Sequence, residues 1–249
     1  MSDRVRNWLL GAVGVTVLLA ACEIIGQTGV GGRTFPPMSE VFEYGIDPSR
    51  RALFRRALDA TFQSSWRGFV IGIVFAVAIA GIGTLIPLLK EGIDRFAASI
   101  HAIPLIALGP LFMLAFSRDS TPTAIAALAT YFPVYVACVS GFEAASRAHL
   151  DVFAVLGSDR RTRFRRLQMP AALPAFSDGL RLAAPAAVLG AILGEWFGAP
   201  RGIGILIVSS MQNFQIRQLW AAALLAAVVS LIAFALFGAL ERFVVARFR

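Results

Sequence analysis

Six apolar runs, each long enough to cross a lipid bilayer, restrict what this chain can fold into more than any other feature of its sequence. A helix rises about 1.5 Å per residue, so about 20 apolar residues span a hydrocarbon core of about 30 Å. Charged residues make up 15% of the chain, whereas soluble domains carry about 25%. The sequence therefore predicts an all-α polytopic membrane protein with six transmembrane helices. The spans are expected at about residues 8–25, 68–89, 96–116, 122–142, 176–197 and 219–245.

The basic residues lie mainly at the ends of the apolar runs and between them, and they give the chain a net charge of +8. Anionic lipid headgroups and the preference of positive charge for the cytoplasmic side explain this placement. We therefore expect contact with membrane lipid and no binding of nucleic acid. The distribution weakly favours a cytoplasmic N-terminus, and six spans would place the C-terminus on the same side. Cys22 and Cys138 lie in different apolar runs, so they predict neither a disulfide framework nor a metal site.

Two parts are expected along the chain. Residues 1–67 should hold the first span, a linker rich in Gly and Pro, and an amphipathic helix on the membrane surface, and residues 68–249 a core of five further spans. Asp47 and Pro48 are typical of the N-cap and first turn of the surface helix. Its apolar stripe recurs every four residues, as suits a helix lying along a membrane. The stripe consists of Phe54, Leu58, Phe62 and Trp66.

Polar and proline residues predict where the later spans are interrupted. The polar run KEGIDR, residues 90–95, is expected to separate the second span from the third. Pro104 and Pro110 should kink or break the third span, because proline removes a helical hydrogen bond. Pro122 is placed to start the fourth span. Residues 198–218 are rich in Gly and too broken for a complete span, so they are expected to re-enter the membrane in part.

The polar segment between the fourth and fifth spans, at about residues 143–172, predicts two short helices around a hinge. The pattern of residues 150–156 is helical, and Gly157 is well placed for the left-handed residue that ends a helix. Ser158 can cap a second helix that runs to residue 168, and Pro170 should prevent its continuation. Both helices carry large apolar side chains in an arginine-rich surrounding. These side chains need either the groove of a partner protein or the ends of the chain's own spans to cover them, and the sequence leaves both open.

At this segment the sequence resembles a family. Permease subunits of bacterial ATP-binding-cassette importers carry a signature of Glu-Ala-Ala, three residues, Gly, nine residues and Ile-x-Leu-Pro. Here Asp151-Val152-Phe153 is followed after three residues by Gly157, and nine further residues lead to Leu167-Gln168-Met169-Pro170. The spacing is kept, while Asp replaces Glu and Val-Phe replaces the two alanines. The triplet Glu143-Ala144-Ala145 matches the family's letters, but its glycine position would hold His149, so this register is rejected.

Other segments resemble the permeases of nitrate, sulfonate and taurine importers: HAIPLIALGPL (101–111), LPAFSDGLRLA (173–183) and GEWFGAPRGIG (194–204). The resemblance implies a type I importer in the bacterial inner membrane, with both termini cytoplasmic. Two permeases, either two copies or this chain and a paralogue, would join two cytoplasmic ATP-binding subunits and an extracytoplasmic substrate-binding protein. It also implies an ATPase-coupling loop that contains Asp151, Val152, Phe153, Gly157, Arg163, Phe164, Leu167 and Pro170.

No catalytic or metal site is expected in this chain. It has no GxxxxGK[ST] phosphate loop, so ATP and Mg²⁺ should bind to the partner ATPase, and the chain itself should not be an enzyme. The alternative is a secondary transporter or channel that works without an ATPase. Proton-coupled carriers place carboxylates in mid-membrane, whereas the centres of the six predicted spans contain no Asp or Glu.

Arg181 and Glu195 are the ionisable residues singled out in the fifth span. Charge inside a membrane costs about 2.5–3.5 kcal/mol on insertion scales, so such residues point to function or to local pairing. The two lie about 14 positions apart, roughly 21 Å along a helix, with one near each end of the span. Either could line the transport pathway, or both could be structural. His101, near the start of the third span, is expected at the membrane interface.

Overall fold

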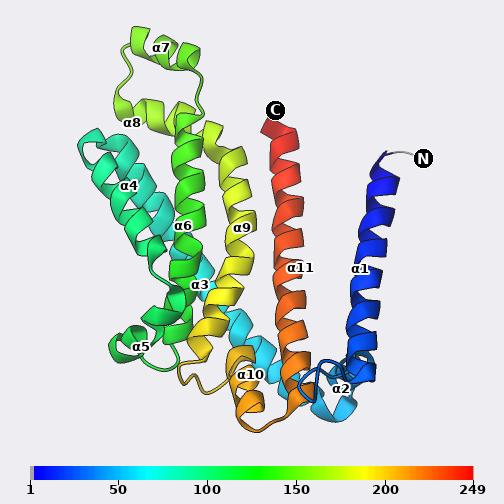
Figure 1. Ribbon diagram of the computed structural model, residues 1–249. Coiled ribbons are helices and arrows are strands. Elements are labelled where there is room, and N and C mark those ends of the chain that lie inside the picture. The colour runs from blue at the N-terminus through cyan, green and yellow to red at the C-terminus, as the bar shows by residue number, and fades with distance from the viewer. Residues whose placement is uncertain (1–2, 249) are drawn as a thin grey trace.

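The computed structural model describes residues 3–248, and these residues form helices joined by short loops (Figure 1). Within this range, five helical segments are long and apolar enough to cross a membrane, and a bent pair of helices reaches the same length and apolar character when its two members are taken together. The predicted all-α polytopic architecture is confirmed. The spans are α1 (Asp3–Thr28), α3 (Arg51–Leu85), the pair α4 (Pro87–Ala102) and α5 (Leu105–Ala115), α6 (Thr121–Glu143), α9 (Met169–Glu195) and α11 (Ile216–Phe248).

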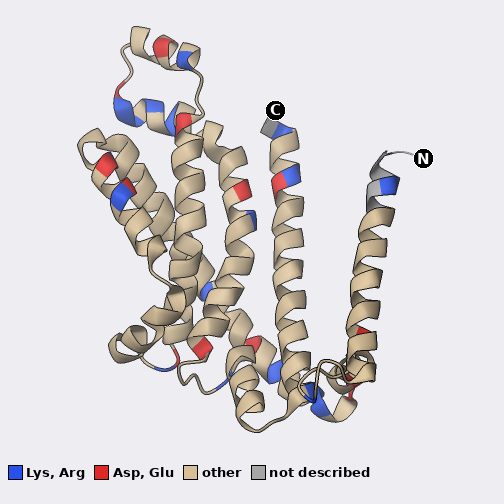
Figure 2. Ribbon diagram, viewed as in Figure 1, with Lys and Arg blue, Asp and Glu red and all other residues tan. Residues whose placement is uncertain are grey.

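Short helices cap the two ends of the bundle (Figure 1). α7 (Arg147–Val155), α8 (Arg160–Arg163) and a π-helical turn, η2 (Phe164–Gln168), lie at the same end as both chain termini. α2 (Met38–Ile46), a 3-10 turn (Pro48–Arg50) and α10 (Ile203–Gln212) lie at the opposite end. Charged residues gather towards the two ends, and the helices between them are mostly uncharged (Figure 2).

Small residues let α6 pack closely between α3 and α9 at the centre of the bundle. A Cβ atom added at Gly72 of α3 would lie 2.5 Å from the Ala127 carbonyl oxygen of α6. One added at Gly190 of α9 would lie 2.9 Å from the Ala126 Cα. Apolar side chains gain little from leaving lipid, so close backbone approach of this kind is a main source of helix association in membranes.

One unbroken helix, α3, covers the residues for which the sequence predicted a surface helix followed by a separate second span. Residue 68 therefore lies inside a helix, and no proline interrupts the chain between Arg51 and Leu85. The apolar stripe is divided: Phe54 is buried, whereas Phe62 and Trp66 are 58% and 52% exposed. The face of α3 that turns to the core at this level consists of small residues instead, because those permit close packing.

The polar run at residues 90–95 does not separate two spans, contrary to the prediction, since it lies within α4. The turn comes earlier, at Ile86, and Pro87 begins α4, where its missing N–H leaves no helical bond unmade. The predicted break at Pro104 is confirmed, because α4 and α5 meet there at 97°. Pro110 lies within α5 and does not end it.

Candidate functional site

The candidate site is the loop between α6 and α9, and its first half is α7. Ser146 caps this helix by accepting a hydrogen bond from the His149 N–H at 3.3 Å. Gly157 follows the helix with φ +67°, so its predicted left-handed conformation is confirmed. The Gly157 N–H donates to the Ala154 carbonyl, and the Ser158 N–H donates to the Phe153 carbonyl, both at 3.0 Å. These two bonds form a Schellman motif, which fixes the direction in which the chain leaves α7.

Ser158 does not cap the second helix, contrary to the prediction, because its hydroxyl also donates to the Phe153 carbonyl, at 2.6 Å. Asp159 takes that role, and its carboxylate accepts the Thr162 N–H at 3.1 Å. Hydrogen bonds from the side chain and backbone of Thr162 lower the pKa of Asp159. The two residues are neighbours and both are good capping types, and the prediction placed the cap one residue too early.

α7 stands clear of the ends of the transmembrane helices (Figure 1) and carries exposed apolar side chains. Val152, Val155 and Leu156 are 54%, 88% and 76% exposed. Asp151 is also exposed, and Phe153 is half-buried. The first half of the signature therefore presents an apolar surface beyond the bundle, at an end of the molecule where charged residues are common (Figure 2).

The second half of the loop is attached to the protein's own spans. Phe164 meets Phe142 of α6 edge to face, with ring centroids 4.9 Å apart. The Gln168 side-chain amide donates to the Phe142 carbonyl at 3.2 Å. Arg163 and Leu167 are half-buried alongside. The sequence left open whether a partner protein or the chain's own spans would cover the apolar side chains of the loop. The chain's own helices cover those of this second half, whereas the apolar side chains of α7 stay exposed in the described part of the chain.

Pro170 does not end the second helix, contrary to the prediction. Residues 160–195 form one helical segment that passes through α8, η2 and α9. Proline clashes with the carbonyl four residues before it in a regular α-helix. The π-helical turn η2 precedes Pro170, and the Met169 N–H donates to the Phe164 carbonyl five residues back. This wider turn shifts the hydrogen-bond register and lets the helix continue through the proline.

Glu195, at the far end of α9, is fully buried and held by hydrogen bonds. The Thr61 hydroxyl of α3 donates to its carboxylate at 2.7 Å, and the Gly204 N–H of α10 donates to it at 2.6 Å. The Ile203 N–H donates in turn to the Thr61 hydroxyl at 2.8 Å. The carboxylate thus joins three helices and satisfies two N–H groups at the start of α10 directly or through Thr61.

Arg181 pairs with Glu241 of α11, with Nη1 and Oε2 2.8 Å apart. Its guanidinium also lies 4.3 Å from the centre of the Phe234 ring. Sequence reasoning missed Glu241, although it is the only acidic residue in the last apolar run. The structure does not bring Arg181, Glu195 and the loop together into one site. Glu195 links helices at the C-terminal end of α9, and Arg181 links α9 to α11 at about the middle of α9.

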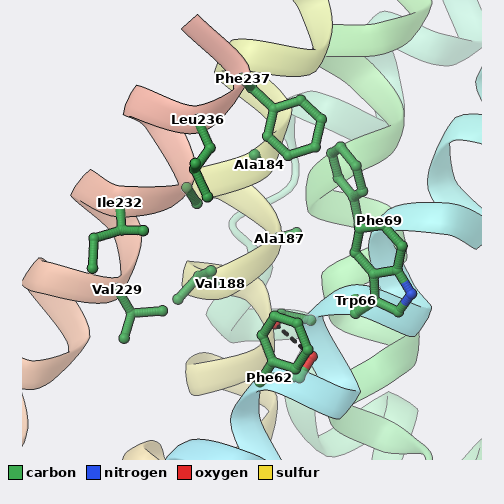
Figure 3. A pocket seen from close by; sticks show the side chains of 12 residues that line it. Phe62, Trp66, Phe69, Ala184, Ala187, Val188, Val229, Ile232, Leu236 and Phe237 are labelled. Carbon is green, nitrogen blue, oxygen red and sulfur yellow. Dashed lines mark hydrogen bonds between the residues drawn. The ribbon is translucent and has the colours of Figure 1, made fainter. Parts of the chain in front are cut away.

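Figure 3 shows an apolar groove of about 350 Å³ between α3, α9 and α11. Phe62 and Trp66, from the predicted surface stripe, line it (Figure 3), and its polar groups are the Ser65 hydroxyl and the Trp66 indole N–H. Neither Arg181 nor Glu195 reaches it. The groove suits apolar matter such as a lipid chain, and it offers nothing that would hold a charged molecule.

Comparison with known proteins matches residues 68–249 to the family model described as binding-protein-dependent transport system inner membrane component. The chain is 31% identical over 195 residues to the formylaminopyrimidine transport permease protein ThiX of Halalkalibacterium halodurans, a match that covers 76% of each chain. It is 27% identical to the riboflavin transport system permease protein RibX of Chloroflexus aurantiacus, covering 98% of this chain and 95% of the relative. It is 26% identical to the putative aliphatic sulfonates transport permease protein SsuC of Bacillus subtilis, covering 95% and 86%.

Proposed function

Because the chain belongs to the family of inner membrane components of binding-protein-dependent transport systems, we propose that it is the permease of an ATP-driven nutrient importer, coupled to its ATPase through residues 151–170. The matched region contains this whole loop, and the relatives are named as transport permeases. The match to a sulfonate permease agrees with the resemblance of three segments to sulfonate importers.

The observation that carries the proposal is the exposed apolar surface of α7. Val155 and Leu156 are 88% and 76% exposed, and α7 lies beyond the ends of the long helices (Figure 1). An amphipathic helix of this kind binds by laying its apolar face into a groove of a partner. A cytoplasmic ATP-binding subunit is the partner that the family provides.

The contacts of the loop suggest how a displacement of α7 would be transmitted to the membrane-spanning helices. The Schellman motif fixes the direction in which the chain leaves α7 towards α8, and α8 continues without a break into α9. Phe164 and Gln168 connect the same segment to α6. At the other end of α9, Glu195 holds the start of α10. Closure of the ATPase pair would therefore move α6, α9 and α10 together, as a rigid-body switch between inward-open and outward-open states.

The assembly follows from the same proposal. Two ATP-binding subunits, carrying ATP and Mg²⁺, would dock at the α7 end, which makes that end and both termini cytoplasmic. A second permease, either a copy of this chain or a paralogue, would complete the pathway, and a substrate-binding protein would dock near α2 and α10. The names of the relatives refer to a pyrimidine, a flavin and sulfonates, so they do not select one substrate class.

The test is copurification of the chain with the ATP-binding subunit encoded beside it. Val155→Glu places a charge on the proposed docking face, and Val30→Glu places one on an equally open valine in the linker, since the two side chains are 88% and 83% exposed. We expect Val155→Glu to lose the ATPase subunit in detergent and Val30→Glu to retain it. Retention by both variants would remove α7 from the docking surface. If the unaltered chain never holds an ATPase, the importer proposal fails and the ATPase-independent transporter or channel takes its place.

A further inference from the structure

The bend between α4 and α5 borders a cavity of about 540 Å³ beside α6 and α9. Its lining comes from the last turn of α4, the first turn of α5, the middle of α6 and the C-terminal half of α9. Helices broken at membrane depth are tolerated where they line a cavity or are buried in protein. The volume falls within the range of about 300–1,000 Å³ that is usual for small-molecule sites. Phe132, on its wall, lies about halfway along α6 and hence near mid-membrane.

The side chains around this cavity are aromatic or aliphatic, and none of them is Lys, Arg, Asp or Glu. Tyr131 and Phe132 supply aromatic surface, and Pro104 and Pro133 supply the flat faces of their rings. The polar side chains are those of His101 and Tyr131. A permanently charged molecule would lose its hydration here without gaining a counter-ion, which is costly in a low-dielectric site. The lining therefore favours an uncharged molecule.

His101 gives the cavity its specific chemistry. Its imidazole lies flat on the Phe132 ring, with centroids 3.8 Å apart and the planes within 6° of parallel. The ring nitrogens lie in the plane of the imidazole, so the stack leaves them uncovered. The His101 side chain is exposed, and its imidazole makes no hydrogen bond to another residue in the described part of the chain. A polar ring edge at this depth needs a partner that the protein itself does not supply.

We propose that this cavity binds the transported molecule, and that this molecule carries a flat, uncharged heteroaromatic ring. Such a ring can stack against the aromatic and proline faces and exchange a hydrogen bond with an imidazole nitrogen of His101. An aliphatic sulfonate, with its full negative charge and no flat face, fits neither feature. The inference rests on the proposed transport function and adds the substrate class and a specificity-determining residue.

The test uses the purified chain in lipid nanodiscs and lumichrome, a fluorescent uncharged tricyclic heteroaromatic compound, as the probe. Fluorescence anisotropy reports its binding, and empty nanodiscs report its partition into lipid. His101→Phe keeps a ring that can stack on Phe132 and removes the nitrogens, so we expect roughly tenfold weaker binding from the lost hydrogen bond. Leu189→Trp fills the cavity from an exposed wall position and should abolish binding.

The matched control is Leu231→Trp, which adds the same side chain to the outer face of α11, away from the cavity. Leu189 and Leu231 are 55% and 66% exposed, so neither replacement disturbs a packed core. We expect Leu231→Trp to bind lumichrome as the unaltered chain does, and excess ethanesulfonate not to displace the probe. Equal binding by both tryptophan variants, or displacement by ethanesulfonate, would overturn the substrate class. If the chain copurifies with its ATP-binding subunit but does not bind lumichrome, this inference is overturned and the proposed transport function is unaffected.

Discussion

The hydroxyl of Thr61 donates a hydrogen bond of 2.7 Å to the carboxylate of Glu195, and both side chains are buried, at 1% and 0% exposure. The two residues lie 134 positions apart in the sequence. Their contact joins α3 to the end of α9, at the point where the start of α10 is also bound. A buried carboxylate of this kind depends on each of its donors, because an unmet hydrogen bond costs more there than at a surface.

Thr61→Val should therefore destabilise the protein by about 1–3 kcal/mol, since it removes the hydrogen bond to one oxygen of the Glu195 carboxylate and leaves the Ile203 N–H without its acceptor. Thr61→Ser keeps the hydroxyl and should recover most of this loss. Ser65→Ala is the control one turn along α3, because that hydroxyl donates only to the Phe62 carbonyl of its own helix. Thermal unfolding in detergent measures all three. Equal stability of Thr61→Val and Ser65→Ala would show that the contact contributes little.

Gly157→Val should uncouple ATP hydrolysis from uptake in reconstituted vesicles. The residue has φ +67°, where a β-branched side chain is strained by roughly 1–2 kcal/mol, although a Cβ atom would meet no other atom within 4 Å. Backbone strain at residue 157, and no clash with a neighbouring side chain, is thus the expected structural difference between this variant and the native chain. Gly157→Asn tolerates the left-handed conformation and should retain uptake. If valine leaves uptake unchanged, the turn after α7 has no part in coupling.

Local features of the fold could be predicted from the sequence, and distant ones could not. The left-handed Gly157 and the break at Pro104 follow from the stereochemistry of single residues, and both predictions are confirmed. Pro170 was mispredicted, because a π-helical turn precedes it and lets the helix continue, and Phe164 of this turn packs against Phe142 of α6. The partners of Glu195 lie on two other helices, and no spacing in the sequence marks them.

The ion pair between Arg181 and Glu241 should stabilise the contact of α9 with α11. In a double-mutant cycle with Arg181→Gln and Glu241→Gln, we expect a coupling energy of about 0.5–3 kcal/mol, because both side chains are largely withdrawn from solvent, at 36% and 20% exposure. Arg95 and Glu91 of α4 form the control pair, with exposures of 78% and 79%, and should couple by less than about 1 kcal/mol. Unfolding in detergent gives both cycles, and equal coupling would mean that burial adds nothing to the inner pair.

The cap of α8 should make the loop sensitive to acid. Hydrogen bonds from Thr162 lower the pKa of Asp159 in the folded protein below its ordinary value of 3.8. The charged cap therefore stabilises the loop at any pH above 3.8, and this contribution is lost as the pH falls through the lower, folded pKa. We expect proteolysis between α7 and α8 to accelerate over that acidic range.

Two variants separate the charge of Asp159 from its capping geometry. Asp159→Asn keeps an oxygen that can accept the Thr162 N–H but does not titrate, so its proteolysis rate should not rise where that of the native chain does. Asp159→Ala removes the cap and should be cleaved faster than the native chain already at neutral pH. The rates are measured with a protease that remains active in acid, and cleavage of an unstructured peptide corrects for its own pH profile. If Asp159→Asn follows the same acid profile as the native chain, the titration of Asp159 is not its cause.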